Sequence, residues 1–291
     1  MTRWILFLAL AFTLASCKLD MKSSEMLFRH DPKEDTMRVL FVHRDITAKG
    51  AKDGAQQLQK LLTGERTFML GFWPFFIELD ERVQEADARL AESRKAGAPD
   101  DESDLLTLVL AKRVRVVETK LGTDVNGALV GWQEVVISEW SKFLSDLNRR
   151  AATSMYKDLS LDGDGCVSVG VILSAEEKIR ALREITKSDG DPDYGSVNAI
   201  LDNLVDVATT ADGIRLKFGK ARGAAVGVRV DATSDPNKKR SGEDQWLERT
   251  PEDRARLNEA LKAEGVVLDR VDADAKIRSI TGEKTPVDDA K

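Results

Sequence analysis

The segment 114–137 reads VRVVETKLGTDVNGALVGWQEVVI, and its two valine-rich runs flank the pair Asn126-Gly127. Valine is enriched in strands, and Asn-Gly readily adopts the positive φ angles of a tight hairpin turn. The runs 114–121 and 129–137 are therefore predicted to form an antiparallel hairpin. This is the clearest hairpin in the chain, and it indicates a sheet built from neighbouring strands.

Amphipathic helices are predicted beside this hairpin. Ser138 stands at an N-cap position, and the apolar residues after it follow the spacing of one buried helical face: Trp140, Phe143, Leu144, Leu147 and Ala151. A capping box at 174–177 and proline directly after Thr250 mark two further helix starts. Helices are also expected over 52–62, along one face from Leu79 to Leu90, and from Ser196 to Ala208.

Further strands are predicted from alternating or apolar runs. Segments 26–29 and 38–46 flank a turn at 31–35. Segments 214–218 and 226–230 alternate on either side of 220–223 and are predicted to form one hairpin. Hairpins with intervening helices, and no regular βαβ alternation, predict an α+β fold. We expect a largely antiparallel sheet of hairpins with packed amphipathic helices.

The composition excludes some classes of protein. The chain has 291 residues, is 42% hydrophobic and 32% charged, and carries a formal charge of −6. Such a chain is too apolar for disorder and too polar for a polytopic membrane protein. Its acidic balance argues against nucleic acid as a partner, because binding phosphates needs a concentrated basic surface. Only two cysteines occur, so an apolar core must hold the fold together.

The first residues, MTRWILFLALAFTLASC, are typical of an export signal. Arg3 gives a positive start, 4–13 is apolar but too short to span a bilayer, and the small residues Leu14-Ala15-Ser16 lead to Cys17. This segment resembles the lipobox of bacterial lipoproteins. The resemblance implies cleavage before Cys17, a diacylglyceryl group on its sulfur and an acylated new amino terminus.

That resemblance also implies a location. The mature protein would be exported and membrane-anchored, facing the periplasm or the outside. Lys18 stands where aspartate would retain an enteric lipoprotein at the inner membrane, so the outer membrane is favoured over the inner one. The expected organisation is a signal peptide at 1–16, a lipidated tether at 17–25, an α+β domain at 26–230, a polar linker at 231–250, and a C-terminal segment with a helix and tail at 251–291.

One segment is a weak candidate for calcium binding. Asp158, Ser160 and Asp162 occupy positions 1, 3 and 5 of an EF-hand-like loop, with Gly163 at position 6. Position 12 is Val169, so the bidentate glutamate is missing. A solvated Asp-Gly turn is the favoured interpretation, and no cofactor is expected apart from the covalent lipid.

Other candidate residues are weaker still. His30 and His43 are expected towards opposite ends of one hairpin, too far apart to share a metal, and Cys166 is interpreted as a small buried residue. The aromatic stretch 67–77 is either a buried strand, which is favoured, or a patch that faces a membrane or partner.

The sequence contains no catalytic signature, and several functions stay open. The favoured hypothesis is a lipid-anchored envelope protein whose soluble domain binds or scaffolds another envelope protein without catalysis. The alternative is a membrane-tethered periplasmic hydrolase that uses carboxylates assembled by the fold. A receptor for a soluble ligand is a third possibility.

Overall fold

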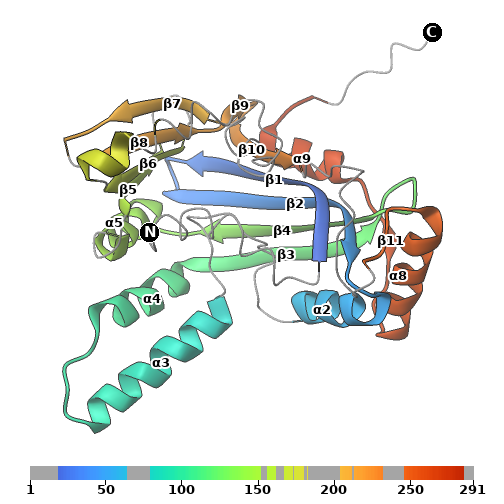
Figure 1. The fold of residues 1–291 in the computed structure, drawn as a ribbon, viewed down its shortest axis with the longest axis horizontal. Helices are drawn as coiled ribbons and strands as arrows, with labels where there is room; N and C mark the ends of the chain where they lie inside the picture. Colours follow the sequence, from blue (N-terminus) through green and yellow to red (C-terminus); the bar gives the residue numbers. More distant parts are fainter. Residues whose placement is uncertain are drawn as a thin grey trace.

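A computed structural model describes residues 19–63, 79–151, 156–161, 167–172, 174–179, 182, 204–211, 213–231 and 246–284. It contains a seven-stranded sheet, a four-stranded sheet and helices packed against them (Figure 1). Among the described strands, every pair is antiparallel except the pairing of β11 with β3. The predicted α+β class with a largely antiparallel sheet is therefore confirmed.

The large sheet has the order β11-β3-β4-β2-β1-β10-β9. Its strands are β1 (Leu19–Asp31), β2 (Thr36–Ala48), β3 (Val114–Thr123), β4 (Leu129–Ile137), β9 (Lys220–Arg222), β10 (Ala225–Asp231) and β11 (Asp269–Arg270). The small sheet has the order β5-β6-β8-β7. Its strands are β5 (Tyr156–Leu161), β6 (Val167–Ile172), β7 (Leu204–Thr209) and β8 (Gly213–Phe218).

The hairpin of β3 and β4 is confirmed, and residues within its turn stabilise that turn. Thr123 pairs with Leu129, and the Asp124 carboxylate accepts hydrogen bonds from the backbone N–H groups of Asn126 and Ala128 at 2.8 and 2.9 Å. Gly127 has φ of 73°, in the left-handed region that glycine adopts without a steric penalty. Local chemistry is thus sufficient to specify this turn.

The first hairpin is also confirmed, but it is longer than predicted. β1 pairs with β2 from Leu19↔Ala48 to Asp31↔Thr36, so the tether expected at 17–25 is wrong from Leu19 onward. Alternate side chains in this stretch are buried, among them Ser23 and Glu25. Because two of these buried residues are polar, the apolar alternation that identifies a strand is weak there.

Two predictions about the later strands are wrong. Segments 214–218 and 226–230 do not form one hairpin, because β8 pairs with β6 and β7 whereas β10 pairs with β1 and β9. The helix expected to reach Ala208 is a strand over its last part, where β7 lies, and residues 196–203 are outside the described ranges. Alternation identifies a strand but does not identify its partner.

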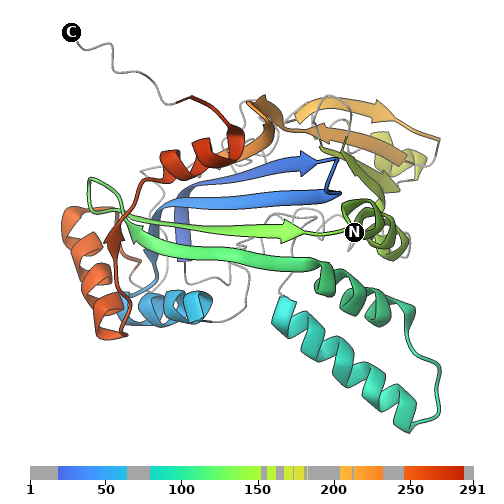
Figure 2. The ribbon, with the colours of Figure 1, turned by 180° about the vertical axis from the view of Figure 1, so that it is seen from behind.

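The principal helices are α2 (Ala51–Thr63), α3 (Leu79–Lys95), α4 (Glu102–Arg113), α5 (Trp140–Ala151), α8 (Pro251–Ala263) and α9 (Ala273–Thr281). The Thr250 hydroxyl caps α8 by accepting from the Asp253 N–H, as predicted, and the capping box of Ser174 and Glu177 forms reciprocally. Helices α4 and α9 were not expected from the sequence. Figure 2 shows α3 and α4 as an antiparallel pair that extends away from the sheet.

The start of α5 differs from the prediction. Ser138 does not cap it; its hydroxyl donates to the Arg113 carbonyl at 3.2 Å. The cap comes from Asp35, whose carboxylate accepts from the N–H and hydroxyl of Ser141 at 3.0 and 2.7 Å. The turn of the first hairpin therefore holds a helix more than a hundred residues later, which local spacing could not indicate.

The segment 231–250 is not wholly a polar linker. Residues 232–245 are outside the described ranges, but Trp246 bridges to Lys49 and Leu247 is buried, with its N–H donating to the Ala48 carbonyl at 2.9 Å. Its last residues therefore pack beside β2. The strand expected at 266–268 is also displaced, since β11 begins at Asp269.

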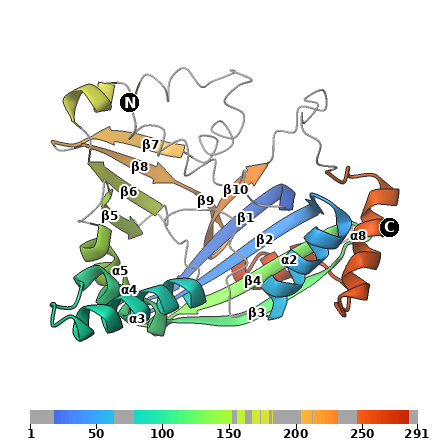
Figure 3. The same ribbon diagram turned by 60° about the horizontal axis from the view of Figure 1, so that its bottom comes forward.

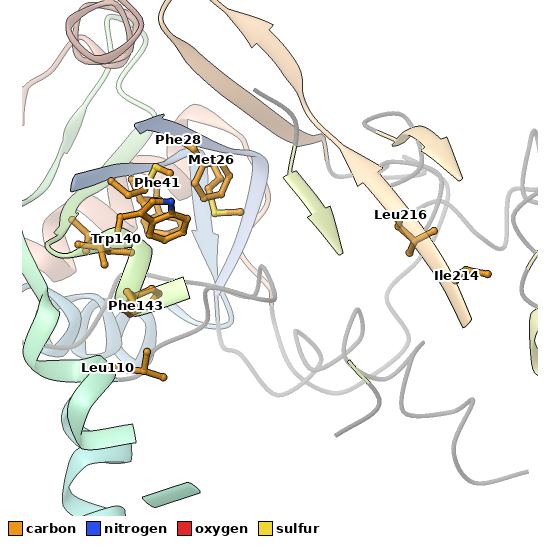
Figure 4. Packing of buried hydrophobic residues seen from close by; sticks show 12 residues of the cluster. Met26, Phe28, Phe41, Leu110, Trp140, Phe143, Ile214 and Leu216 are labelled. Atoms are coloured by element: carbon orange, nitrogen blue, oxygen red, sulfur yellow. The ribbon is translucent and has the colours of Figure 1, made fainter. Parts of the chain in front are cut away.

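The apolar core links these elements. On one face of the large sheet, Leu27, Leu40 and Trp132 pack against Ile277 and Ile280 of α9. A second cluster joins sheet residues to α4, α5 and β8; it contains Met26, Phe28, Met37, Val39, Phe41, Leu110, Val135, Ile137, Trp140, Phe143, Ile214 and Leu216 (Figure 4). A third cluster joins Leu19 and Ala48 to α2 and α8, at the other end of the sheet (Figure 3).

Candidate functional site

The predicted lipidation site lies directly before the folded body. Cys17 is outside the described residues, and the first described residue, Leu19, follows it by two positions. Leu19 is buried in the cluster with α2 and α8 and pairs with Ala48. In the described ranges, no helix is long and apolar enough to cross a membrane.

The fold brings two carboxylates together on neighbouring strands. Glu118 of β3 is the cross-strand partner of Glu134 of β4, a pairing that repels unless a cation intervenes. Lys276 of α9 supplies that cation, with its Nζ 2.6 Å from Glu118 Oε2 and 2.7 Å from Glu134 Oε2. Trp132 Nε1 donates to Glu118 at 3.0 Å, and Arg38 Nε lies 3.4 Å from Glu134.

The charges in this cluster stabilise one another. The hydrogen bond from Lys276 lowers the pKa of Glu118 below its usual value, against the effect of partial burial. Burial disfavours the charged form of Lys276, but hydrogen bonds to both glutamates outweigh it and raise the lysine pKa. A carboxyl group that acts as a general acid needs a raised pKa, so that it still holds its proton at neutral pH. The pKa of Glu118 is shifted the other way. This cluster therefore acts as an electrostatic clamp between α9 and the sheet.

A second charged cluster lies where β1 begins. Arg249 Nη2 lies 3.0 Å from Asp20 Oδ2, and Arg254 Nη2 lies 3.0 Å from each carboxylate oxygen of Asp45. The side chain of Asp45 is largely buried. Its backbone has φ of 51° and lies at an irregularity in the pairing of β2 with β4. These bonds fix the segment before α8 and its first turn to β1 and β2. The sequence could not reveal them, because the partners are more than two hundred residues apart.

Three other carboxyl groups have a lowered pKa for similar reasons. The side-chain hydrogen bond from Ser141 lowers the pKa of Asp35, Arg94 lowers that of Asp100, and Lys142 lowers that of Glu139. Glu139 is exposed and Asp35 and Asp100 are partly buried, and in each case capping or ion pairing holds the ionised form. They favour a structural role for these carboxylates over acid catalysis.

The calcium candidate lies partly in a strand. Asp158 and Ser160 belong to β5, whose backbone pairs with β6 through Asp158↔Gly170 and Ser160↔Ser168, while Asp162 is outside the described residues. Across the described ranges, no group of three His, Cys, Asp or Glu side chains is placed to hold a metal ion. The solvated turn stays the favoured prediction here and calcium binding the weaker alternative; the role of Cys166, which is also outside those ranges, stays a prediction too.

The two histidines lie well apart on the first hairpin. His30 pairs with Met37 beside the turn, whereas His43 pairs with Ser24, six positions further along β1 and hence about 20 Å away. His43 is buried, and its Nδ1 is 2.8 Å from the Ser24 hydroxyl oxygen. Their predicted separation is confirmed.

Exposed apolar side chains occur on α4 and at the β3–β4 turn. Leu105 and Val109 are each 38% exposed and lie one helical turn apart, and Val125 in the turn is 70% exposed. The aromatic stretch 67–77 lies outside the described residues, so both interpretations of it stay open.

Comparisons with known proteins find no similar protein. The chain matches no family model, no curated protein and no solved structure. The lipobox-like residues 14–17 and the geometry described above are therefore the basis for assigning a function.

The clamp predicts a pH dependence that can be measured. Because the pKa of Glu118 is lower in the folded state, its stabilising effect is present above the unfolded pKa and is lost as pH falls through the folded pKa. Between pH 7 and pH 3, wild type should lose more free energy of unfolding than Glu118→Gln. The difference should be below about 1 kcal/mol, because the Glu118 side chain is 42% exposed and water screens its interaction with Lys276.

Chemical denaturation at the two pH values measures this difference. Glu92→Gln is the matched control, since Glu92 is exposed on α3 and should change nothing. If wild type and Glu118→Gln lose equal free energy of unfolding between pH 7 and pH 3, the clamp does not stabilise the fold.

Proposed function

We propose that this protein is a lipid-anchored component of the bacterial cell envelope, whose exported α+β domain binds or scaffolds another envelope protein without catalysing a reaction. The observation that carries this proposal is the segment Leu14-Ala15-Ser16-Cys17, after a basic and apolar start and two residues before the strand that begins at Leu19. Lys18 favours the outer membrane as the destination.

Anchoring follows from the energetics of acyl chains. One chain gives marginal, reversible binding, whereas two or more chains, at about 0.8 kcal/mol per buried methylene, give persistent attachment. A diacylglyceryl group together with an N-acyl chain meets that requirement. Nothing in the described part of the fold needs to insert in the bilayer for the protein to remain on it.

A binding role is favoured over catalysis by the state of the carboxylates. Glu118 and Glu134 share Lys276, and Asp45 accepts a bidentate hydrogen bond from Arg254. Side chains used in this way maintain the fold and are not free for proton transfer. The hydrolase alternative would need a carboxyl group with a raised pKa, and each carboxyl group described above with a shifted pKa has it lowered.

Detergent phase separation tests the anchor. Full-length protein produced in a bacterium should enter the detergent-rich phase, because its acyl chains partition into micelles. A matched protein that begins at Leu19 should remain in the aqueous phase. If both versions stay aqueous, the protein carries no lipid and the proposed function is wrong.

A further inference from the structure

The structure defines how a lipid at Cys17 would orient the domain. We infer that the end of the large sheet where β1 begins lies against the lipid headgroups. This end is marked by the buried pair Leu19 and Ala48, with the start of α2 and Trp246–Leu247 packed beside it, and is called the anchor end below. The inference rests on the proposed lipidation and adds to it the face that meets the membrane.

The anchor end is fixed to the chain that carries the lipid. Leu19 is 3% exposed and pairs with Ala48, so β1 is part of the core from its first described residue. The Ala48 carbonyl also accepts from the Leu247 N–H, and the Thr47 hydroxyl donates to the Leu247 carbonyl at 2.8 Å. Arg249 pairs with Asp20, the second residue of the strand. The start of β1 is therefore held by β2 and by the segment before α8.

The reach of the chain then limits the distance to the bilayer. Two residues span at most about 7 Å, so the Cα of Cys17 lies within about that distance of Leu19. Its acyl chains have to enter the hydrocarbon region, which places the anchor end at the headgroups. A flexible linker of about twenty residues would extend some 25 Å and leave the orientation free. No such length of chain separates Cys17 from the core.

The opposite end of the sheet is correspondingly distant. Along β2, the eleven residue steps from Ala48 to Met37 correspond to about 36 Å of strand. Helices α4 and α5 lie at that far end, and α2 and α8 lie at the anchor end (Figure 1). The exposed pair Leu105 and Val109 on α4 would therefore be held away from the membrane, where a partner can reach it.

The β3–β4 turn adds an apolar contact on the membrane side. It lies at the anchor end, because Leu129 pairs with Ile46, which in turn pairs with Met21. Val125 in this turn is 70% exposed although it is apolar. Burying an apolar side chain at the bilayer interface is favourable, so Val125 gains by lying there.

Fluorescence quenching in vesicles tests this orientation. Full-length lipidated protein with Cys166→Ser would carry one reporter cysteine, at Val125→Cys for the anchor end or Val109→Cys for the far end, labelled with a fluorophore. In phosphatidylethanolamine–phosphatidylglycerol vesicles containing a headgroup-level spin-labelled lipid, the Val125→Cys label should be quenched several-fold more. Equal quenching of the two labels on membrane-bound protein would overturn the inference and leave the proposed function standing.

Two further measurements separate the possible failures. A glycine–serine spacer of about twenty residues between Lys18 and Leu19 should equalise quenching of the two labels without releasing the protein. If the protein does not bind vesicles at all, the proposed lipidation fails and the inference fails with it. Hydrogen exchange of unsubstituted protein provides a readout without labels. Vesicles should protect the amides of 124–127 more than those of 96–98 and 100. Equal protection would contradict the orientation.

Discussion

Replacing Cys17 with serine is expected to move the protein from the membrane fraction to the soluble fraction of the cell. Serine has no thiol to receive a diacylglyceryl group, so the acyl chains proposed to hold the protein on the bilayer would be absent. The described part of the chain offers no membrane-spanning helix to replace them. Fractionation in buffer without detergent, followed by immunoblotting, measures the change.

Cys166→Ser is the matched control for this experiment. It removes the other cysteine of the chain and should leave the protein in the membrane fraction. If Cys17→Ser fractionates like wild type, another contact holds the protein on the membrane and the lipobox interpretation is wrong. Release by both substitutions would indicate loss of folding, and thermal unfolding of the soluble material would detect it.

Phe143→Ala is expected to cause the largest loss of stability among single core substitutions. Phe143 is 0% exposed and stacks on Trp140, with ring centroids 5.7 Å apart, inside the cluster that joins α5 to both sheets. Truncation removes apolar contacts and leaves a cavity, which typically costs about 3–5 kcal/mol. Urea denaturation of the α+β domain should show a lower midpoint with little change in slope.

Val109→Ala provides the comparison for that experiment. Val109 is apolar and helical but 38% exposed, so its truncation should change the free energy of unfolding by no more than about 0.5 kcal/mol. If Phe143→Ala costs as little as Val109→Ala, the cluster around α5 does not hold the two sheets together as described.

Local signals account for the parts of the fold that the sequence predicted well. The β3–β4 hairpin follows from Asn126-Gly127 between apolar runs, and α8 follows from Thr250 and Pro251. In each case the residues that form the turn or cap lie within four positions of one another. The predictions agree with the structure because the hydrogen bonds that form the turn and the cap join residues close together in the sequence.

Contacts between remote segments account for what the sequence did not predict. The alternating pattern predicts strands at 214–218 and 226–230. It does not predict their partners, and in the structure the first pairs with β6 and the second with β1. The cap of α5 comes from Asp35, and the cation between Glu118 and Glu134 comes from Lys276. The early start of β1 was missed because Ser23 and Glu25, which are polar, occupy buried positions.

That early start changes the functional interpretation most. With a tether over 17–25, the domain would have moved freely above the bilayer. With β1 beginning at Leu19, a lipid on Cys17 would be separated from the core by a single residue, Lys18. The proposed anchor would therefore also set the orientation of the domain.

Mass spectrometry of the N-terminal peptide shows directly whether Cys17 carries a lipid. The peptide should be taken from protein in the membrane fraction of native cells. We expect this peptide to begin at Cys17 and to carry the mass of a diacylglyceryl group and an N-acyl chain. A peptide that retains Met1, or one cut elsewhere with a free thiol at Cys17, would contradict the proposed lipidation.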